Sequence, residues 1–204
     1  SVARSFAWGE HEAEALRARY PELADRVAVT GSPRADLWRP ELAAVHDRHQ
    51  LPPLDDRPVI LLSSNFSAAL DVNPIWVRLR DKRERFDGLD DPVEFDQYTF
   101  ASDKLRVLRE YVRAARRLAR AHPDAVVVVR PHPIEQDGAW EDLLGAGDNM
   151  MVTREGTLTA WIRRASVLIQ NGCTSGYEAA LLRTPSIAFH PHGIFADHPS
   201  NLFG

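Results

Sequence analysis

Residues 166–180, Ser-Val-Leu-Ile-Gln-Asn-Gly-Cys-Thr-Ser-Gly-Tyr-Glu-Ala-Ala, predict a buried strand that passes through a tight turn into a helix. The apolar run Val167–Ile169 is typical of a strand, and the small residues from Gly172 to Gly176 are typical of a turn. Backbone N–H groups, two hydroxyls and the positive end of a helix dipole converge there, which favours a phosphate. The stretch therefore predicts a ligand-binding turn.

Two further segments have the same form. Ala125–Val129 is a run of β-branched residues followed by Arg-Pro-His-Pro at residues 130–133, and the apolar run Val59–Ser63 leads to Asn65. If the three strands are parallel, their turns open at the carboxyl edge of one sheet, where open α/β proteins bind ligands.

Strand and helix patterns alternate after residue 57, which predicts an α/β fold with a Rossmann-like parallel sheet and helices on both of its faces. A long polar loop is expected from Asn65 to about Phe100. The predicted helices cover about 102–121, 135–144, 158–164 and 175–183. The predicted strands are Val59–Ser63, Ala125–Val129, Met150–Thr153, Ser166–Gln170 and Ser186–Phe189.

A segment rich in proline and aspartate, Leu51–Pro58, predicts a linker. It divides the chain into residues 1–50 and 51–204. The first part reads as a helix over Glu10–Arg19, a strand over Arg26–Thr30 and a helix near Glu41–Arg48.

The composition excludes several classes of protein. A net charge of −4 gives no electrostatic signature of nucleic-acid binding, and the basic run Arg106–Arg120 reads as the solvated face of a helix. A single cysteine rules out an internal disulfide and agrees with a reducing compartment. The sequence holds no apolar stretch near the roughly 18 residues that a transmembrane helix needs.

Several motifs of catalysis and cofactor binding are absent. The sequence has no G-x-G-x-x-G, no P-loop and no G-x-S-x-G elbow. Cys173 reads as a small turn residue rather than a nucleophile. No metal site is predicted, because the metal-like side chains near the C-terminus lack helical spacing. These are His190, His192, Asp197 and His198.

Each candidate site residue also has a structural interpretation. His132 is either a ligand of the site or part of a rigid strand exit between two prolines, while Arg130 offers a forked charge to a phosphate. Asn65 either meets ligand or satisfies the backbone of its turn. The remaining alternatives concern the turn after residue 170. Thr174 and Ser175 fit a helix N-cap, and Glu178 either reaches a ribose or completes a capping box with Ser175.

Four motifs in order resemble those of bacterial surface-carbohydrate biosynthesis proteins. They are Val-Thr-Gly-Ser-Pro-Arg-Ala-Asp-Leu at 29–37, Ser-Asn-Phe at 64–66, Arg-Pro-His-Pro at 130–133 and Asn-Gly-Cys-Thr-Ser-Gly-Tyr-Glu at 171–178. The chain is similar in these motifs to GT-B-type glycosyltransferases, among them capsule sialyl- and Kdo-transferases and CDP-glycerol glycerophosphotransferases.

The resemblance implies two Rossmann-like domains that face each other across a cleft. Residues 1–50 would be the tail of the N-terminal, acceptor domain with its linker, and residues 51–204 the C-terminal domain that binds the nucleotide sugar. The general base would come from the N-terminal side, outside this chain. The implied donor and phosphate ligands are Asn65, Arg130, His132, Pro133, Cys173, Thr174, Ser175, Gly176 and Glu178.

The implied activity is metal-independent transfer of a sugar from a CMP- or CDP-linked donor to a surface polysaccharide. The partners would be the nucleotide sugar, as co-substrate rather than cofactor, and a carbohydrate or lipid-linked glycan acceptor, with no nucleic acid. The resemblance implies a cytoplasmic protein and leaves a peripheral contact with the inner membrane open. A nucleotide-sugar 2-epimerase is an alternative, although the sequence lacks a Gly-Gly phosphate turn where Cys173-Thr174-Ser175 stands. A non-catalytic nucleotide-binding domain is another.

Overall fold

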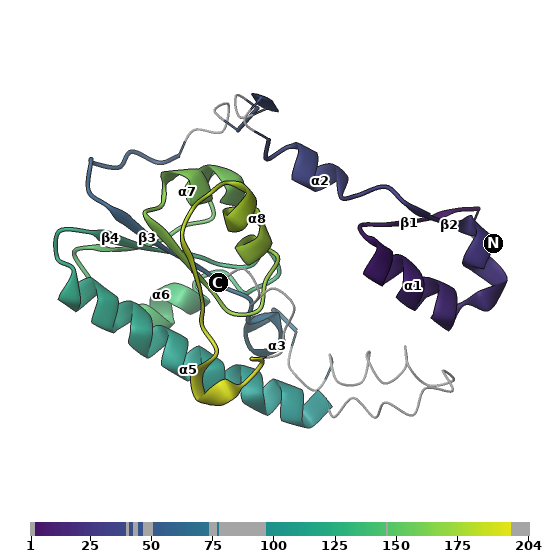
Figure 1. Ribbon diagram of the computed structural model, residues 1–204. Helices are drawn as coiled ribbons and strands as arrows, with labels where there is room; N and C mark the ends of the chain where they lie inside the picture. The colour runs from purple at the N-terminus through teal and green to yellow at the C-terminus, as the bar shows by residue number, and fades with distance from the viewer. Residues whose placement is uncertain are drawn as a thin grey trace. The chain divides into compact units, whose positions relative to one another are not determined.

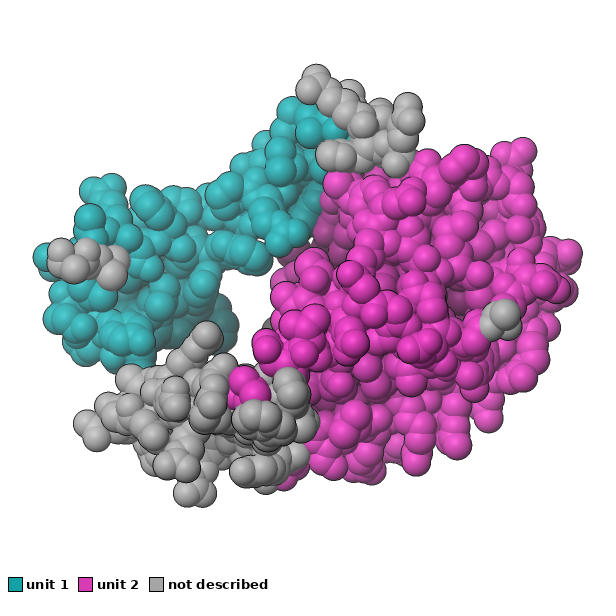
Figure 2. Space-filling model, turned by 180° about the vertical axis from the view of Figure 1, so that it is seen from behind, with its two compact units in different colours: residues 1–48 teal, residues 49–204 magenta. Residues whose placement is uncertain are grey.

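A computed structural model describes residues 3–39, 41–42, 45–46, 51–73, 77, 97–145 and 147–196. The chain divides into two compact units, Ser1–Arg48 and His49–Gly204 (Figure 2). The assignment of these units to an acceptor domain and a donor domain stays a prediction.

The first unit is built on two short parallel strands, β1 (Ser5–Ala7) and β2 (Val27–Val29). Between them lie the helix α1 (Glu10–Arg19) and the 3-10 helix η1 (Pro21–Arg26). The predicted helix and the predicted strand at Arg26–Thr30 are therefore confirmed, whereas β1 was missed because a three-residue strand is too short for a recognisable alternation. A short helix, α2 (Pro33–Asp36), follows β2, and half of the helix predicted near Glu41–Arg48 lies outside the described residues.

The second unit contains the predicted five-stranded parallel sheet, in the order β5-β4-β3-β6-β7 (Figure 1). The central β3 pairs with β4 on one side and with β6 on the other, so that Ser63 lies level with Arg130 and with Gln170. The carboxyl ends of these three strands therefore lie side by side. The strands are β3 (Val59–Ser63), β4 (Val126–Arg130), β5 (Met150–Val152), β6 (Val167–Gln170) and β7 (Ser186–Ala188).

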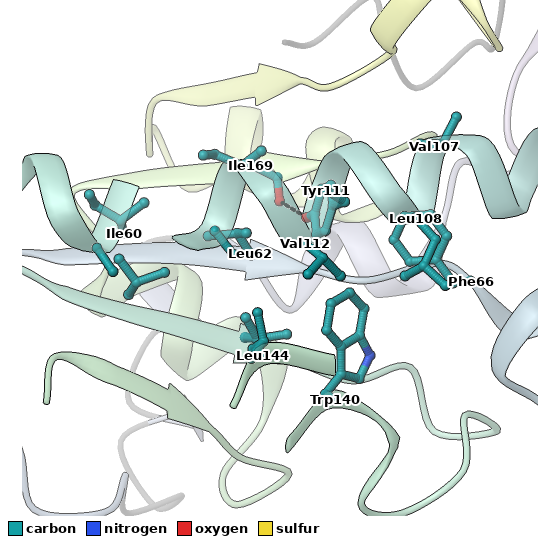
Figure 3. Packing of buried hydrophobic residues seen from close by; sticks show 14 of the residues in the cluster. Ile60, Leu62, Phe66, Val107, Leu108, Tyr111, Val112, Trp140, Leu144 and Ile169 are labelled. Carbon is teal, nitrogen blue, oxygen red and sulfur yellow. Dashed lines mark hydrogen bonds between the residues drawn. The ribbon is translucent and has the colours of Figure 1, made fainter. Parts of the chain in front are cut away.

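Helices cover both faces of the sheet, which explains why every residue of β3 is buried (Figure 1). On one face, α5 (Gln97–Ala121) and α6 (Ala139–Leu144) pack on Ile60 and Leu62 around Tyr111 and Trp140 (Figure 3). On the other face, α7 (Leu158–Arg164) and α8 (Ser175–Leu181) pack on the alternate strand residues. None of the helices in the described ranges is both long enough and apolar enough to cross a bilayer.

The structure corrects three predicted boundaries. A short helix, α3 (Ser67–Leu70), occupies part of the predicted loop, and α5 begins five residues earlier than expected. The helix predicted from Glu135 begins instead at Ala139, since Glu135 forms an isolated β-bridge with Asp71 and Gly138 has a φ of 80°. A positive φ suits glycine and interrupts a right-handed helix.

Candidate functional site

Two of the predicted turns are joined directly at the carboxyl edge of the sheet. The Asn65 side chain donates from Nδ2 to the Gly172 carbonyl at 2.7 Å. In return, Asn171 Nδ2 donates to the Asn65 carbonyl at 3.4 Å. Asn65 therefore does satisfy turn backbone, as its structural interpretation proposed, and in doing so it fixes the turn after β3 against the turn after β6.

The third turn joins them through Ser64. The Ser64 N–H donates to the Arg130 carbonyl at 3.1 Å, and the His132 N–H donates to Ser64 Oγ at 3.0 Å. The turns that carry Asn65, His132 and Thr174 thus open on one edge, as the parallel sheet predicts. Whether their side chains bind a ligand stays a prediction.

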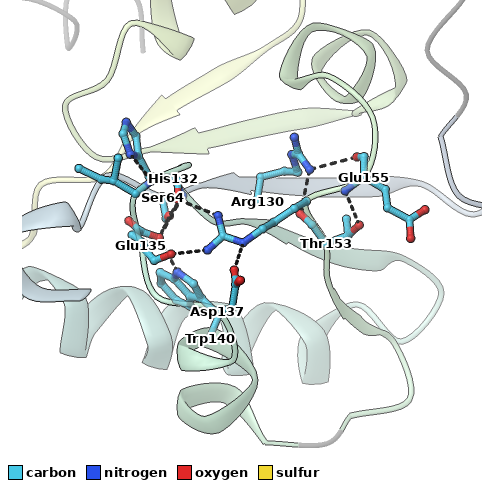
Figure 4. A network of polar contacts seen from close by, with 10 residues as sticks. Ser64, Arg130, His132, Glu135, Asp137, Trp140, Thr153 and Glu155 are labelled. Carbon is cyan, nitrogen blue, oxygen red and sulfur yellow. Dashed lines mark hydrogen bonds and ion pairs between the residues drawn. The ribbon is translucent and has the colours of Figure 1, made fainter. Parts of the chain in front are cut away.

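Glu135 is the residue that holds the His132 turn, and the sequence interpretation missed it. Its carboxylate is 2% exposed and accepts four hydrogen bonds, and Figure 4 shows it among Ser64, His132 and Trp140. Phe66 N–H donates to Oε1 at 2.7 Å, whereas Oε2 accepts from Ser64 Oγ at 2.5 Å, His132 N–H at 3.0 Å and Trp140 Nε1 at 2.8 Å. A buried carboxylate is tolerated when its oxygens accept hydrogen bonds in this way. The spacing of His132 and Glu135 matches the backward reach of a capping box, a signal that the sequence did contain.

Arg154, which follows β5, also holds the turn that carries His132. Its guanidinium donates to the His132 carbonyl at 2.9 Å and to the Glu135 carbonyl at 2.6 Å. It also pairs through Nε with Asp137 at 2.9 Å. Next to it opens a hollow of about 530 Å³, lined by residues of the β4–α6 connection and of the segment after β5.

The guanidinium of Arg130 is engaged by backbone carbonyls. Nη1 donates to the Thr153 and Glu155 carbonyls at 3.0 Å each, and Nη2 donates to the Gly156 carbonyl at 2.9 Å. Burial lowers the pKa of Arg130, and the charge of Arg154 lowers it further. Arg130 therefore shapes the loop after β5, a role that the sequence interpretation did not include; contact with a phosphate stays a prediction.

The imidazole of His132 points away from Glu135 (Figure 4). The Ile134 N–H approaches Nδ1 at 3.4 Å, so that Nδ1 acts as the acceptor. In the neutral ring this leaves the proton on Nε2, which can donate to a ligand. Pro133, the next residue, is exposed.

The turn after β6 contains polar atoms that lack partners. Ser175 is 1% exposed, and neither its Oγ nor Asn171 Oδ1 has a hydrogen-bond partner among the described residues. Thr174 is exposed and stands at the N-cap of α8 without a side-chain capping bond. The Cys173 N–H donates to Gln170 Oε1 at 2.9 Å, which fixes the shape of the turn that leads to the buried Gly176.

Glu178 points to the neighbouring helix. Its buried carboxylate accepts a hydrogen bond from the hydroxyl of Thr159 on α7. The predicted capping box with Ser175 does not form, since the Ser175 hydroxyl has no partner. The physical reason is that Ser175 lies inside α8 rather than at its N-cap. A contact of Glu178 with ribose stays a prediction.

Lys104 was also missed by the sequence interpretation. It is 6% exposed, lies 4.7 Å from the ring centroid of Phe195, and donates from Nζ to the Asn65 carbonyl at 3.1 Å. Burial lowers the pKa of Lys104 to about 8, against the opposing effects of Cys173 and Glu135. Lys104 shares the buried face of α5 with Leu108 and Tyr111 at helical spacing, so a lysine within an apolar stripe was the available signal.

Tyr111 connects β3 and β6 close to their turns. Its hydroxyl lies 3.0 Å from the Ser63 carbonyl and 2.8 Å from the Ile169 carbonyl, and burial raises the pKa of Tyr111. The described residues include no group of three or more His, Cys, Asp or Glu that could hold a metal ion. Asp197 and His198 lie outside the described ranges.

No protein-family model matches the sequence, and no curated protein matches it significantly. Solved structures do resemble it. The structure of S. aureus MnaA with UDP is 15% identical, with a TM-score of 0.56 over 96% of this chain and 45% of MnaA. A UDP-GlcNAc 2-epimerase of Methanocaldococcus jannaschii is 11% identical, with a TM-score of 0.49 over 96% of this chain and 48% of that protein. The wall teichoic acid polymerase TagF is 14% identical, with a TM-score of 0.46 over 91% of this chain and 37% of TagF.

This chain spans less than half the length of each of these proteins. The likeness to MnaA agrees with the sheet described above, and the predicted Rossmann-like α/β fold is confirmed.

Proposed function

We propose that this chain is the donor-binding part of a glycosyltransferase that takes a sugar from a nucleotide-activated donor. The observation that carries the proposal is the pair of buried, unpartnered atoms Ser175 Oγ and Asn171 Oδ1 where three turns meet. A buried polar group without a partner costs about 1–3 kcal/mol. A ligand that supplies the missing hydrogen bonds removes that cost.

The chemistry of these atoms suits a nucleotide sugar better than a bare phosphate. The hydroxyls of Ser175 and Thr174 and Nε2–H of His132 can donate to phosphate oxygens, whereas Asn171 Oδ1 can only accept. A hydroxyl of ribose or of the sugar would satisfy that acceptor. During transfer, negative charge develops on the leaving phosphate, and donors already fixed in place stabilise it without reorganisation.

The donor is expected to be CMP- or CDP-linked, and this expectation rests on the resemblance in sequence motifs. MnaA, whose fold this chain shares, carries UDP in its structure, so a uridine nucleotide is the competing candidate. The acceptor is expected to be a carbohydrate or lipid-linked glycan of the bacterial surface, met at the cytoplasmic side of the membrane. The general base is expected from outside this chain.

Calorimetric titration with CMP, CDP, UDP, GDP and ADP tests the proposal. The wild-type chain should prefer a cytidine nucleotide, and Ser175→Ala should lose about 1.5–3 kcal/mol of binding free energy, or roughly 10- to 150-fold in affinity. Ser166→Ala is a matched control, because the exposed Ser166 precedes the same strand at the opposite edge. Equal affinity in both variants, or no nucleotide binding, would remove the proposed site.

Product analysis separates transfer from its alternatives. A transferase releases nucleotide faster when an acceptor is added, whereas a 2-epimerase interconverts nucleotide sugars without one. Binding without either reaction would indicate a nucleotide-binding domain that needs a further catalytic part.

A further inference from the structure

The outer face of α5 is an arginine stripe, which we define as Arg106, Arg109, Arg113, Arg116, Arg117 and Arg120. Nine residues between Ser102 and Ala121 are exposed, and the stripe supplies six of them. The arginines follow one another at intervals of three or four, apart from one adjacent pair, so they share one side of the helix. The opposite side of α5 is buried in the core.

The stripe gives the chain a strong charge asymmetry. Within α5, six arginines and Lys104 stand against Asp103 and Glu110, which gives the helix a net charge of +5. Because the whole chain carries −4, all other residues together carry −9. An anionic surface would therefore attract α5 and repel most of the remaining chain, which fixes one orientation.

Part of this charge is uncommitted. Glu110 pairs with Arg109 and Arg113, and Asp103 pairs with Arg106, but these ion pairs are exposed and exchange readily. Arg117 and Arg120 have no hydrogen bond or ion pair with any described residue.

We infer that the arginine stripe binds the surface of an anionic lipid bilayer. From Arg106 to Arg120 the stripe covers 14 helical steps, or about 21 Å, along a straight and convex surface. Arg116 donates to the Leu143 and Leu144 carbonyls of α6, at 2.7 and 3.1 Å. The other five arginines can meet a flat plane together, whereas a polymer chain is better held in a groove. The hollow that adjoins the C-terminal end of the stripe, about 470 Å³ in volume, is lined by Arg116, Arg120 and Asp148. Leu105, 51% exposed, stands beside Arg106 where it can enter the interface.

The inference does not rest on the proposed nucleotide site, and vesicle flotation of the full 204-residue chain tests it. The chain should float with phosphatidylcholine vesicles that contain about one third phosphatidylglycerol, and binding should fall steeply with salt. Arg117→Gln with Arg120→Gln should lower partitioning about 25-fold, from roughly fivefold per arginine near a charged membrane.

The matched control is Arg163→Gln with Arg183→Gln, which removes the same charge from exposed positions on and after the helices of the other face. It should partition like the wild-type chain. Equal loss in both double variants, equal binding to vesicles of phosphatidylcholine alone, or stripe-dependent binding of heparin or duplex DNA without binding of anionic vesicles would each overturn the inference.

Discussion

The turn after β4 and the turn after β6 lie at the same edge of the sheet but differ in how their polar groups are satisfied. In the turn after β4, the Glu135 carboxylate accepts four hydrogen bonds, and the Arg154 guanidinium donates to two backbone carbonyls. In the turn after β6, Ser175 Oγ and Asn171 Oδ1 are buried without partners. A complete network rigidifies a structure, whereas an incomplete one leaves places for a ligand. The first turn is therefore a support, and the second is the turn at which we propose that a ligand binds.

The largest expected effect comes from breaking the support. Glu135→Ala removes the acceptor of four donors, of which only the His132 N–H keeps another, Ser64 Oγ, and the free energy of unfolding should fall by about 4 kcal/mol or more. Urea denaturation measures this loss. Glu141→Ala, at an exposed position of α6, is the control and should change stability by less than about 0.5 kcal/mol. If Glu135→Ala were as mild as the control, the contrast between the turns would be wrong.

Lys104 provides the next largest effect, through pH. Its pKa is lowered in the folded state to about 8 from 10.5, so folding disfavours the charged amine. The stability of the wild-type chain should therefore fall as pH drops from about 10.5 to about 8, by about 3 kcal/mol in total, and remain low at neutral pH.

The variant Lys104→Met lacks the titrating amine, so its stability should not depend on pH in this range. It should be more stable than the wild-type chain near pH 7, and this difference in the free energy of unfolding should shrink as pH rises towards the pKa of lysine in the unfolded chain. A series of denaturation curves over pH measures both. If the variant instead lost stability at pH 7, the hydrogen bond from Lys104 to the Asn65 carbonyl would outweigh the cost of burying the charged amine.

A smaller effect on stability is expected at two threonines that stand at the starts of helices. Thr157 caps α7 and accepts from the Ala160 N–H at 3.2 Å, whereas Thr174 makes no side-chain capping bond on α8. Thr157→Ala should thus cost about 1 kcal/mol of stability and Thr174→Ala less than about 0.5 kcal/mol. Thermal unfolding of both variants checks this; equal losses would show that Thr174 serves its helix.

The smallest expected effect is the loss of stability in Ser175→Ala. The hydroxyl makes no hydrogen bond in the described structure, so its removal should leave the free energy of unfolding unchanged within about 0.5 kcal/mol or raise it slightly. Unfolding measured without and with nucleotide sharpens the result, because ligand stabilisation should shrink in this variant alone. A clear loss without ligand would place Ser175 among the structural residues.

The sequence predicted the sheet because its strands are continuous apolar runs, such as Val126–Val129, between regular helical patterns. It also predicted that Asn65, His132 and Thr174 share one edge, since that follows from parallel strands alone. The hydrogen-bond partners of the side chains could not be predicted in this way. Arg130 is charged, but local pattern does not show that its donors are taken by carbonyls 23–26 residues further along the chain.

The two residues that the sequence analysis missed, Glu135 and Lys104, make tertiary contacts that local sequence patterns do not show. Glu135 was assigned to a helix by its neighbours, and its four donors come from three separate segments of the chain. Lys104 was not singled out, although its position belongs to the apolar stripe of its helix. Local spacing hinted at both residues, but their long-range partners, Ser64 and Phe66 for Glu135 and Asn65 for Lys104, do not follow from periodicity.

The bond between Ser64 and Glu135 spans 71 positions in the sequence, and this has a consequence for the order in which the protein folds. The donors on His132 and Trp140 lie within five residues of Glu135, but those on Ser64 and Phe66 reach the carboxylate only when β3 and β4 have paired, with the whole of α5 between them already in place. We therefore expect these bonds to form after the transition state, so that Glu135→Gln would speed unfolding while leaving the folding rate nearly unchanged. The carboxyl edge would then be the last part of the sheet to assemble and the first to open.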